Sequence, residues 1–390
     1  MARVRCSNFI LLLLIIAEAV TALASEPRRW PQEKANEWYA SERWLVGSNF
    51  LPSTAINQLE MWQADTFDSK TIDRELGWAE SIGMNTMRVF LHNLPWREDS
   101  QGFLSRLEQF LQIADKHHIR ITFVLLDSVW DPYPQTGRQR APRPHVHNSG
   151  WVQAPGAEIL KDSSRWEKEL RPYVTGVLKH FRNDPRILMW DLMNEPDNDN
   201  PPYRGKELPN KAELATRLLK REWQWAREVN PSQPLTSGVW KGDWSSEAAL
   251  SDTARFQLEN SDILTFHSYE PAEVTKRRID SLRRFRRPIV CSEYMARPLG
   301  STFQAILPLL KEQHVGAYNW GFVSGKSQTI YPWDSWENEY TGPPPVWFHD
   351  VFYPDGKPYA AAEVELIKRL TSRGKAASSG QGEAAKNPLQ

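Results

Sequence analysis

The stretch that decides the fold is Ile187-Leu188-Met189-Trp190-Asp191-Leu192-Met193-Asn194-Glu195-Pro196. A continuous apolar run closed by a breaker is typical of a strand buried on both faces, as in a parallel sheet. Pro196 cannot donate to a ladder, so the strand should end there. The pattern places Asn194 and Glu195 at the C-terminal end of a buried strand, where parallel α/β proteins carry their chemistry. The alternative is a glutamate that is merely solvated.

The chain on either side of this strand alternates between apolar runs and helical patterns. Strands are predicted over residues 44–50, 84–91, 119–126, 234–239, 263–267, 288–293 and 315–320. Helices are predicted over residues 68–81, 101–116, 165–181, 211–229, 274–285, 302–312 and 361–370. The alternation occurs about eight times, which favours a single-domain (β/α)₈ TIM barrel over an open doubly wound sheet. The sequence shows no internal repeat, and no linker divides the chain into two domains.

The N-terminus has the three parts of a secretory signal peptide. Arg3 and Arg5 precede an apolar core at residues 9–20, and Ala22-Leu23-Ala24 predicts cleavage after Ala24. The apolar core is too short for a comfortable membrane span. We therefore expect a secreted or periplasmic protein with no membrane attachment after cleavage. The predicted organisation is a signal peptide at 1–24, a catalytic domain at 25–372 that starts with a polar lead-in, and a disordered tail at 373–390.

Composition narrows the class of partner. The 48 basic and 48 acidic residues balance, so nothing points to nucleic acid or to an anionic membrane surface. The 18 tryptophans are the unusual feature, and several lie in loops rich in Pro and Gly. Those loop tryptophans are Trp96, Trp130, Trp151, Trp244, Trp333 and Trp336. Such side chains suit stacking on sugar rings, although any one of them can equally belong to the core.

Polar side chains follow several of the predicted strands. They are Arg88, His92, Asn93, Asn194, Glu195, His267, Ser268, Tyr269, Glu293, Tyr294 and Trp320. In a barrel, the fourth and seventh strands lie across the mouth from one another, so Glu195 and Glu293 can face each other. Two carboxyl groups at one mouth are what glycoside hydrolysis requires, one protonated and the other ionised. The presence of Glu293 therefore favours a catalytic role for Glu195 over the alternative of a solvated side chain.

Neighbouring residues have predicted roles around the pair. Arg88 and Tyr269 are expected to donate to Glu293 and keep it ionised, although a structural ion pair is the alternative for Arg88. Asn194 is expected to hydrogen-bond a sugar hydroxyl next to the anomeric centre. Trp320 is expected to form the floor of the sugar subsite.

Together these residues resemble clan A glycoside hydrolases, and family 5, the cellulase and mannanase group, is most similar. The resemblance covers roughly residues 44–347. It implies a retaining double displacement with Glu195 as acid/base and Glu293 as nucleophile, supported by His267 and Tyr269. One departure stands out: members of the family usually carry a His at the end of the third strand, where this chain has Leu126-Asp127-Ser128-Val129.

We therefore expect a secreted retaining β-glycosidase that acts on a β-linked polysaccharide or oligosaccharide of the β-1,4-mannan, glucan or xylan type. The predicted substrate-binding residues are Arg88, His92, Asn194, His267, Tyr269, Trp320, Trp130 and Trp333. Neither a cofactor nor a metal is expected, and a monomer is expected. The two carboxyls should lie about 5 to 5.5 Å apart. The loops at 127–161 and 325–347 should wall the cleft; the sugar and endo or exo action stay open.

Other classes fit the sequence less well. His145-x-His147 and the pair His117, His118 suggest metal binding, but the first lies in a Pro-rich loop without a carboxylate at matching spacing. The second pair ends a helix, where cations are favoured. The acidic stretch at 197–199 suggests a structural Ca²⁺ or a solvated turn, and no Gly-x-Ser-x-Gly motif of serine esterases is present. A non-catalytic carbohydrate-binding barrel is the remaining rival.

Overall fold

The computed structural model describes residues 29–372; the predicted signal peptide at 1–24 and the predicted tail at 373–390 lie outside them. Eight parallel strands form the central sheet, in the order β5-β4-β3-β2-β1-β8-β7-β6. The strands are β1 (Val46–Asn49), β2 (Thr86–Phe90), β3 (Arg120–Asp127), β4 (Ile187–Asn194), β5 (Leu235–Thr236), β6 (Leu264–His267), β7 (Ile289–Tyr294) and β8 (Gly316–Asn319). A parallel bridge between Val239 and Phe266 joins the two edges, so the predicted (β/α)₈ barrel is confirmed.

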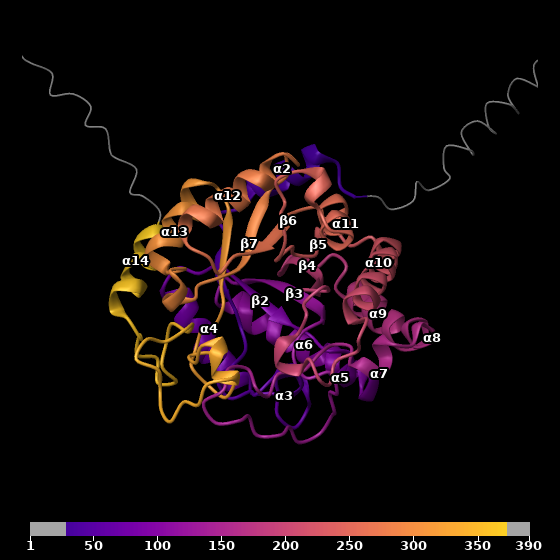
Figure 1. The fold of residues 1–390 in the computed structure, drawn as a ribbon, viewed down its shortest axis with the longest axis horizontal. Helices are drawn as coiled ribbons and strands as arrows, with labels where there is room; N and C mark the ends of the chain where they lie inside the picture. The colour runs from indigo at the N-terminus through magenta and orange to yellow at the C-terminus, as the bar shows by residue number, and fades with distance from the viewer. Residues whose placement is uncertain (1–28, 373–390) are drawn as a thin grey trace, which may run out of the picture.

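Helices surround the barrel (Figure 1). The longer ones are α2 (Gln32–Ser41), α4 (Ser69–Ser81), α6 (Ser100–Lys116), α9 (Arg171–His180), α10 (Lys211–Val229), α11 (Asp252–Asn260), α12 (Ala272–Arg283), α13 (Phe303–Glu312) and α14 (Ala361–Thr371). Short helices are α3 (Gln58–Trp62), α5 (Asn93–Glu98), α7 (Ala157–Leu160) and α8 (Ser163–Arg165), and a π-helical turn at Trp166–Leu170 precedes α9. The predicted cap Asp68 is confirmed, because its side chain accepts from Thr71 N at the start of α4.

The apolar strand residues explain why the barrel closes. All eight positions of β4 are buried, as the uninterrupted apolar run predicted. Its outward-facing Trp190 stacks on Phe123 of β3, with ring centroids 5.8 Å apart. Buried aromatic area of this kind is the main favourable contribution to packing the helices on the sheet. Most polar residues of the strands lie in the barrel interior or at its C-terminal mouth; Arg120, at the N-terminal end of β3, is partly exposed and pairs with Glu42.

The N-terminal segment corrects one prediction. Residues predicted as a polar lead-in include the helix α2, which begins at Gln32. Trp30 and Ala35 are buried against strand residues at the N-terminal end of the barrel, among them Leu188 and Tyr318. The sequence did not predict α2 as a helix because it has few apolar residues. Only a small part of its surface packs on the cluster at the N-terminal end of the barrel.

One further prediction was wrong in detail, and one helix was missed. The strand predicted over 234–239 pairs with β4 only at Leu235 and Thr236, and the helix α11 was not foreseen. Gly238 lies directly against His267 and Ser292, where a Cβ would come within 3.4 Å of each side chain. The chain leaves the β4 ladder after Thr236, and Val239 then pairs with Phe266 of β6.

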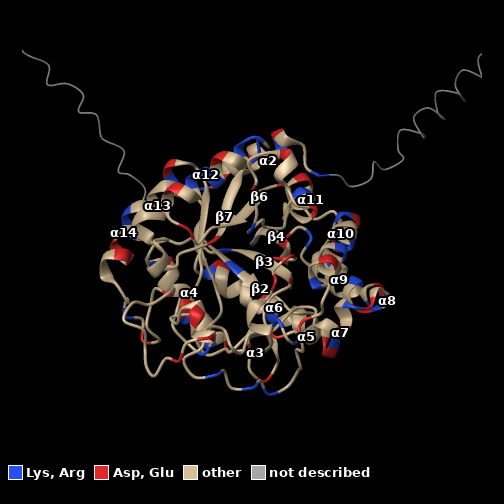
Figure 2. Cartoon of the chain, viewed as in Figure 1, with Lys and Arg blue, Asp and Glu red and all other residues tan. Residues whose placement is uncertain are grey.

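Charged residues of both signs are interspersed over the outer helices (Figure 2). The mixture agrees with the balanced composition. Within residues 29–372, no helix combines the length and the hydropathy needed to cross a membrane.

Candidate active site

The two glutamates lie at the C-terminal ends of β4 and β7. Glu195 follows the last residue of β4 and has a positive φ of 41°, a strained conformation for a non-glycine residue that is common at functional sites. Glu293 lies within β7, where His267 pairs with it across a shift in the strand register. Such irregularities turn strand-end side chains toward the mouth of a barrel. Both glutamates are buried, with 8% and 4% of their surfaces exposed.

The carboxyl groups lie close together. One carboxylate oxygen of Glu195, one of Glu293 and a ring nitrogen of His267 are all within 4.8 Å of one another. His267 Nδ1 lies 2.7 Å from Glu195 Oε1 and 3.5 Å from Glu293 Oε2. Burial lowers the pKa of His267 to about 4, so the imidazole between the two carboxyls is neutral. One oxygen of each carboxyl group thus lies within 4.8 Å of an oxygen of the other, a proximity that the shorter of the two known glycosidase geometries requires.

Glu293 is surrounded by donors. Arg88 Nη1 donates to its Oε1 at 2.7 Å, and the Tyr269 hydroxyl donates to its Oε2 at 2.7 Å. Burial raises the pKa of Glu293, whereas His267, Arg88 and the Tyr269 hydrogen bond act to lower it. Both oxygens of Glu293 therefore accept hydrogen bonds that favour the carboxylate form.

Glu195 has a different environment. Its Oε2 accepts from Asn198 Nδ2 at 2.6 Å, and its Oε1 lies 2.7 Å from Nδ1 of the neutral His267. In the part of the chain that the structure describes, no Lys or Arg forms an ion pair with it. The pKa of Glu195 is raised to about 7, mainly by burial and to a smaller extent by the nearby Asp197, against the lowering effect of the Asn198 hydrogen bond. A carboxyl group with such a pKa can be protonated near neutral pH and can give up its proton during a reaction. Burial raises the pKa of both carboxyl groups, but only Glu293 has a guanidinium and a hydroxyl donating to its two oxygens, so the carboxylate form is favoured more at Glu293 than at Glu195.

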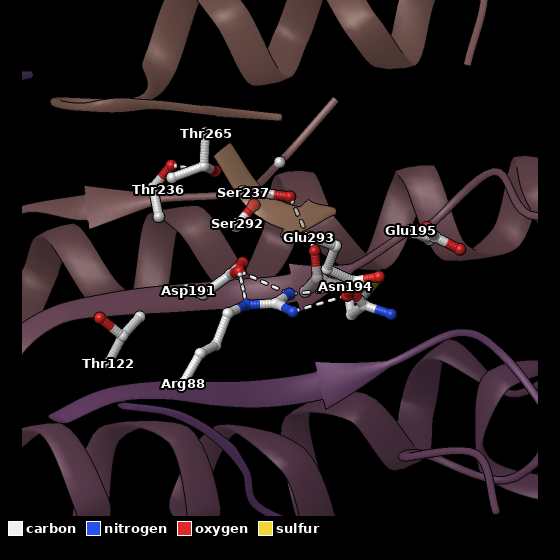
Figure 3. A network of polar contacts seen from close by, with 12 residues as sticks. Arg88, Thr122, Asp191, Asn194, Glu195, Thr236, Ser237, Thr265, Ser292 and Glu293 are labelled. Atoms are coloured by element: carbon white, nitrogen blue, oxygen red, sulfur yellow. Dashed lines mark hydrogen bonds and ion pairs between the residues drawn. The ribbon is translucent and has the colours of Figure 1, made fainter. Parts of the chain in front are cut away.

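Arg88 joins the residues beneath the pair (Figure 3). Its fully buried guanidinium donates to Asn49, Asp191, Asn194 and Glu293. The two carboxylates raise the pKa of Arg88 against the opposing effect of burial. Both interpretations of Arg88 from the sequence therefore hold, because one side chain is a structural ion-pair partner of Asp191 and a donor to Glu293.

Asn194 is oriented from two sides. Its Oδ1 accepts from Arg88 Nη2 at 2.8 Å, and its Nδ2 donates to Asp127 Oδ1 at 3.0 Å. Asp127 ends β3 and is fully buried, and burial raises its pKa well above the usual range. The residue at which this chain departs from the family pattern is therefore part of the network that orients Asn194.

Three predicted aromatic residues lie at the end of β8 and in the two long loops. Trp320, 6% exposed, packs on Phe90 and on Trp151 of the first long loop, with centroids 5.8 and 5.5 Å away. Trp333 is 40% exposed and lies edge-on to Tyr269 at 5.0 Å. Trp130 stacks on Trp336 of the last long loop, with centroids 6.3 Å apart. Trp333 presents the most open aromatic surface of the three.

His92 was predicted to bind substrate, but its two ring nitrogens already have hydrogen-bond partners in the backbone. Its Nε2 is bonded to the Gln153 carbonyl at 2.8 Å, and its Nδ1 accepts from Leu94 N at 3.1 Å. Both ring nitrogens are thus used by the backbone, and burial lowers its pKa to about 3. His92 caps the N-terminus of α5 through Nδ1 and contacts the first long loop through Nε2, so neither nitrogen is left to bind a sugar.

Three buried residues of the site were not predicted as members of it. They are Asn49, Asp127 and Asn198, which contact Arg88, Asn194 and Glu195 respectively. Asn49 and Asp127 end β1 and β3, so the rule that strand ends carry polar function could have found them. Asn198 could be placed only by the fold, since it follows Glu195 in a loop that turns back on the carboxyl group.

The sequence features that suggested metal binding have other partners. His145 and His147 each have Nδ1 bonded to a backbone carbonyl, of Tyr340 and Tyr331 respectively. Asp197 Oδ1 accepts from Trp240 Nε1 at 2.7 Å, and Lys241 pairs with Asp199 at 3.1 Å. Within residues 29–372, the one cluster with metal-ligand geometry is Glu195, His267 and Glu293.

Comparison with known proteins agrees with the geometry. The cellulase family model, glycosyl hydrolase family 5, matches residues 71–307. No curated protein matches the chain in sequence.

Solved structures share the fold at low identity. A β-mannanase from the blue mussel Mytilus edulis is 16% identical, with a TM-score of 0.54 over 85% of this chain and 92% of that one. An endo-β-1,4-mannanase from Thermotoga petrophila is 16% identical, with a TM-score of 0.54 over 86% and 77%. An exo-β-1,4-mannosidase from Opitutaceae bacterium strain TAV5 is 19% identical, with a TM-score of 0.55 over 84% and 60%. At such identities the likeness concerns the fold.

Proposed function

The chain belongs to glycoside hydrolase family 5, and we propose that it cleaves β-glycosidic bonds with retention of anomeric configuration. Glu293 is the nucleophile and Glu195 the general acid and base. The observation that carries this proposal is the pair of buried carboxyls whose oxygens lie within 4.8 Å. Retaining enzymes need this proximity because the nucleophile must touch the anomeric carbon, whereas inverting enzymes leave room for a water.

In the first step, a Glu293 carboxylate oxygen attacks the anomeric carbon and the bond from that carbon to the leaving oxygen breaks. Glu195 gives its proton to the leaving oxygen, so the aglycone departs as a neutral alcohol. Arg88 and Tyr269 hold Glu293 in place and in its charged form. Asn194, held by Arg88 and Asp127, presents its amide to the hydroxyl next to the anomeric centre.

In the second step, the ionised Glu195 takes a proton from water as the water oxygen attacks the anomeric carbon. The bond to Glu293 breaks, the sugar leaves with its original configuration, and both glutamates return to their starting states. Neutral His267 stays hydrogen-bonded to Glu195 through Nδ1 and holds the carboxyl group while its charge changes.

The substrate class that we propose first is a β-1,4-linked mannoside, with glucan and xylan as the alternatives. The support is that solved structures with the same fold are described as β-mannanases and as an exo-β-1,4-mannosidase. The predicted signal peptide supports action outside the cytoplasm, where a polysaccharide substrate is met.

The test is hydrolysis across β-1,4-linked mannan, glucan and xylan and the corresponding aryl β-glycosides. Glu293→Gln should lower kcat by about 10⁴-fold or more on whichever substrate is cleaved, the scale on which removal of a nucleophile acts. Glu158→Gln is the matched control, because Glu158 is exposed and pairs only with Lys161 on the surface. A Glu293→Gln protein that keeps full activity would overturn the assignment.

The same experiment tests the rival binding barrel. Binding of sugars without turnover on any substrate, with equal affinity in the wild type and in Glu293→Gln, would support that rival. Proton NMR of the first product formed should show the β-anomer; an initial α-anomer would contradict retention.

A further inference from the structure

Two loops that are far apart in the sequence are joined above the barrel mouth. The first follows β3 and the second follows β8. We use the word strap for residues 143–149 of the first loop and residues 327–340 of the second. The chain connects them by hydrogen bonds: His145 N to Gln328 Oε1 (2.7 Å), His147 N to Ser335 Oγ (3.0 Å) and Trp336 Nε1 to the His147 carbonyl (2.8 Å).

Aromatic packing adds to these hydrogen bonds. Trp336 lies between side chains of other segments, with Trp130 stacked at 6.3 Å, Tyr203 edge-on at 5.3 Å and the Arg143 guanidinium 5.2 Å from its ring. His145 and Gln328 adopt positive φ angles of 64° and 60°. Such conformations persist in non-glycine residues when the surrounding contacts determine them. The two segments of the strap therefore form one ordered unit that is held by hydrogen bonds and aromatic packing.

The position of the strap follows from the strand order. β2 and β1 lie between β3 and β8 in the sheet, and the base of the second loop lies on the segment after β1, where Lys326 N donates to the Ser53 carbonyl at 3.0 Å. The strap therefore lies on the half of the mouth that contains β1 and β2, and its Trp336 reaches as far as Tyr203 of the loop after β4. Its far end reaches the site: the His147 ring lies 5.3 Å from His349, which lies 5.7 Å from Tyr269. Tyr269 is the residue that donates to Glu293. The strap thus begins beside β3 and ends next to the nucleophile.

This side of the mouth is where the glycone must lie. The line from Glu195 on β4 to Glu293 on β7 divides the mouth into two halves. Trp320, the proposed floor of the sugar subsite, follows β8 in the half that also contains β1 and β2, and we place the sugar under attack on it. The leaving sugar occupies the other half, toward the loop after β5, because Glu195 must reach the oxygen between the two sugars.

The half of the mouth that receives the leaving group is built differently. The loop after β5 carries Trp240, which is partly exposed and donates to Asp197 at 2.7 Å. The same loop is anchored to α12 through Arg278, which donates to the Gly242 carbonyl at 3.4 Å. These contacts hold Trp240 against Asp197, two residues after Glu195. They leave an aromatic surface for the leaving sugar on this side.

We infer that the strap closes the glycone side after a single sugar, so that the enzyme removes one sugar at a time from the non-reducing end. In a glycan chain the glycone is the non-reducing part, and a wall behind its first sugar excludes a continuing chain. The inference rests on the proposed glycosidase function and decides between exo and endo action. Trp320 is the floor of the resulting pocket, and the strap is its end wall.

The first test uses the hexasaccharide of the sugar that the enzyme cleaves in the panel, labelled with a fluorescent amine at the reducing end. Early in the reaction, the expected labelled product is shorter by one sugar, together with free monosaccharide. An early mixture of shorter labelled products would overturn exo action and leave the proposed function standing. A protein that cleaves nothing in the panel, including the aryl β-glycosides, would instead overturn the proposed function.

The second test uses the same hexasaccharide with a bulky cyclic acetal on its non-reducing sugar. The wild type should not cleave this capped substrate. Trp336→Ala removes the stacking on Trp130 and the hydrogen bond to His147, and it should gain internal cleavage of the capped substrate. Tyr353→Ala is the matched control, because this exposed tyrosine packs on Trp347 outside the strap.

Two outcomes of the second test contradict the inference. Cleavage of the capped substrate by the wild type would show that the glycone side is open. Failure of a folded strap variant to cleave it would show that the strap is not the barrier. If Trp336→Ala does not fold, Gln328→Gly replaces it, because glycine accepts the positive φ and deletes the side-chain hydrogen bonds to the first loop.

Discussion

The interior of the barrel mouth and the strap above it are built by different means. In the interior, side chains from neighbouring strands meet around Arg88, and each position is set by the ladder. In the strap, two loops hold one another through backbone groups and one central tryptophan. The difference separates two properties of an enzyme. The rigid sheet positions the reacting groups, whereas the loops decide how much of a substrate can reach them.

The energetic consequences differ as well. Arg88 is a buried cation between buried carboxylates, so its removal leaves charges without compensation in a region that excludes water. Trp336 is only partly buried, so water can fill the space and make the hydrogen bonds that are lost when its side chain is removed. We therefore expect the interior to be sensitive in both stability and activity. The strap should be sensitive mainly in specificity.

The largest expected effect is that of Arg88→Met. Asp191 and Glu293 would both remain buried without their partner, which should lower the free energy of unfolding by about 3 to 5 kcal/mol. Activity should be lost at the same time, because Glu293 would no longer be held in its charged form. Urea denaturation and kcat on the best substrate measure the two effects.

Lys276→Ala is the control for Arg88→Met. Lys276 is half-exposed and pairs with Asp280 on α12, so it should change the free energy of unfolding by no more than about 0.5 kcal/mol. An Arg88→Met protein as stable as this control would contradict the description of Arg88 as the centre of the interior network.

Glu195 gives an effect of intermediate size that depends on pH. Because its pKa is about 7, the acid form that the first step requires is lost as pH rises through that value, and kcat/KM should fall on the alkaline side. Glu195→Gln should lower kcat by about 10²- to 10⁴-fold on substrates with a poor leaving group. The loss should be smaller with an activated aryl leaving group. An equal loss on both kinds of substrate would contradict the acid role.

The same residue links stability to pH. Its pKa in the folded state lies above the unfolded value, so its contribution to stability is complete below the unfolded pKa and is lost as pH rises through about 7. Glu195→Gln should therefore gain stability relative to the wild type between about pH 4.5 and pH 7. Taking the difference between the two proteins cancels Glu75 and Asp350, whose pKa values burial also raises to about 7.

The smallest expected effect is that of Trp336→Ala on global stability. Loss of one stacked aromatic pair near the surface should cost about 1 kcal/mol, although the same variant should change the products formed. Thermal unfolding monitored by circular dichroism measures this difference. A cost as large as that of Arg88→Met would show that the strap belongs to the cooperative core, and the comparison between the two regions would fail.

Much of the candidate site could be predicted because its residues follow strands that stand out in the sequence as apolar runs. Glu195 and Glu293 end apolar runs, and the order of strands in a barrel is enough to place them opposite each other. His92 shows the limit of this argument. It also follows a strand, but the local cap of α5 and a loop carbonyl use both of its nitrogens. A position at a strand end does not reveal which hydrogen bonds a side chain makes.

Local pattern in the sequence by itself was enough to predict the barrel, the two glutamates that we propose as the catalytic pair, and the glycoside hydrolase family. These properties depend on side-chain periodicity and on strand order, and both can be read along the chain. Only the tertiary structure decided that Asp127 orients Asn194, that Asn198 reaches Glu195 and that the two long loops join into the strap. Each of these depends on contacts between segments distant in sequence or on the path of a loop, for which no local pattern carries the signal.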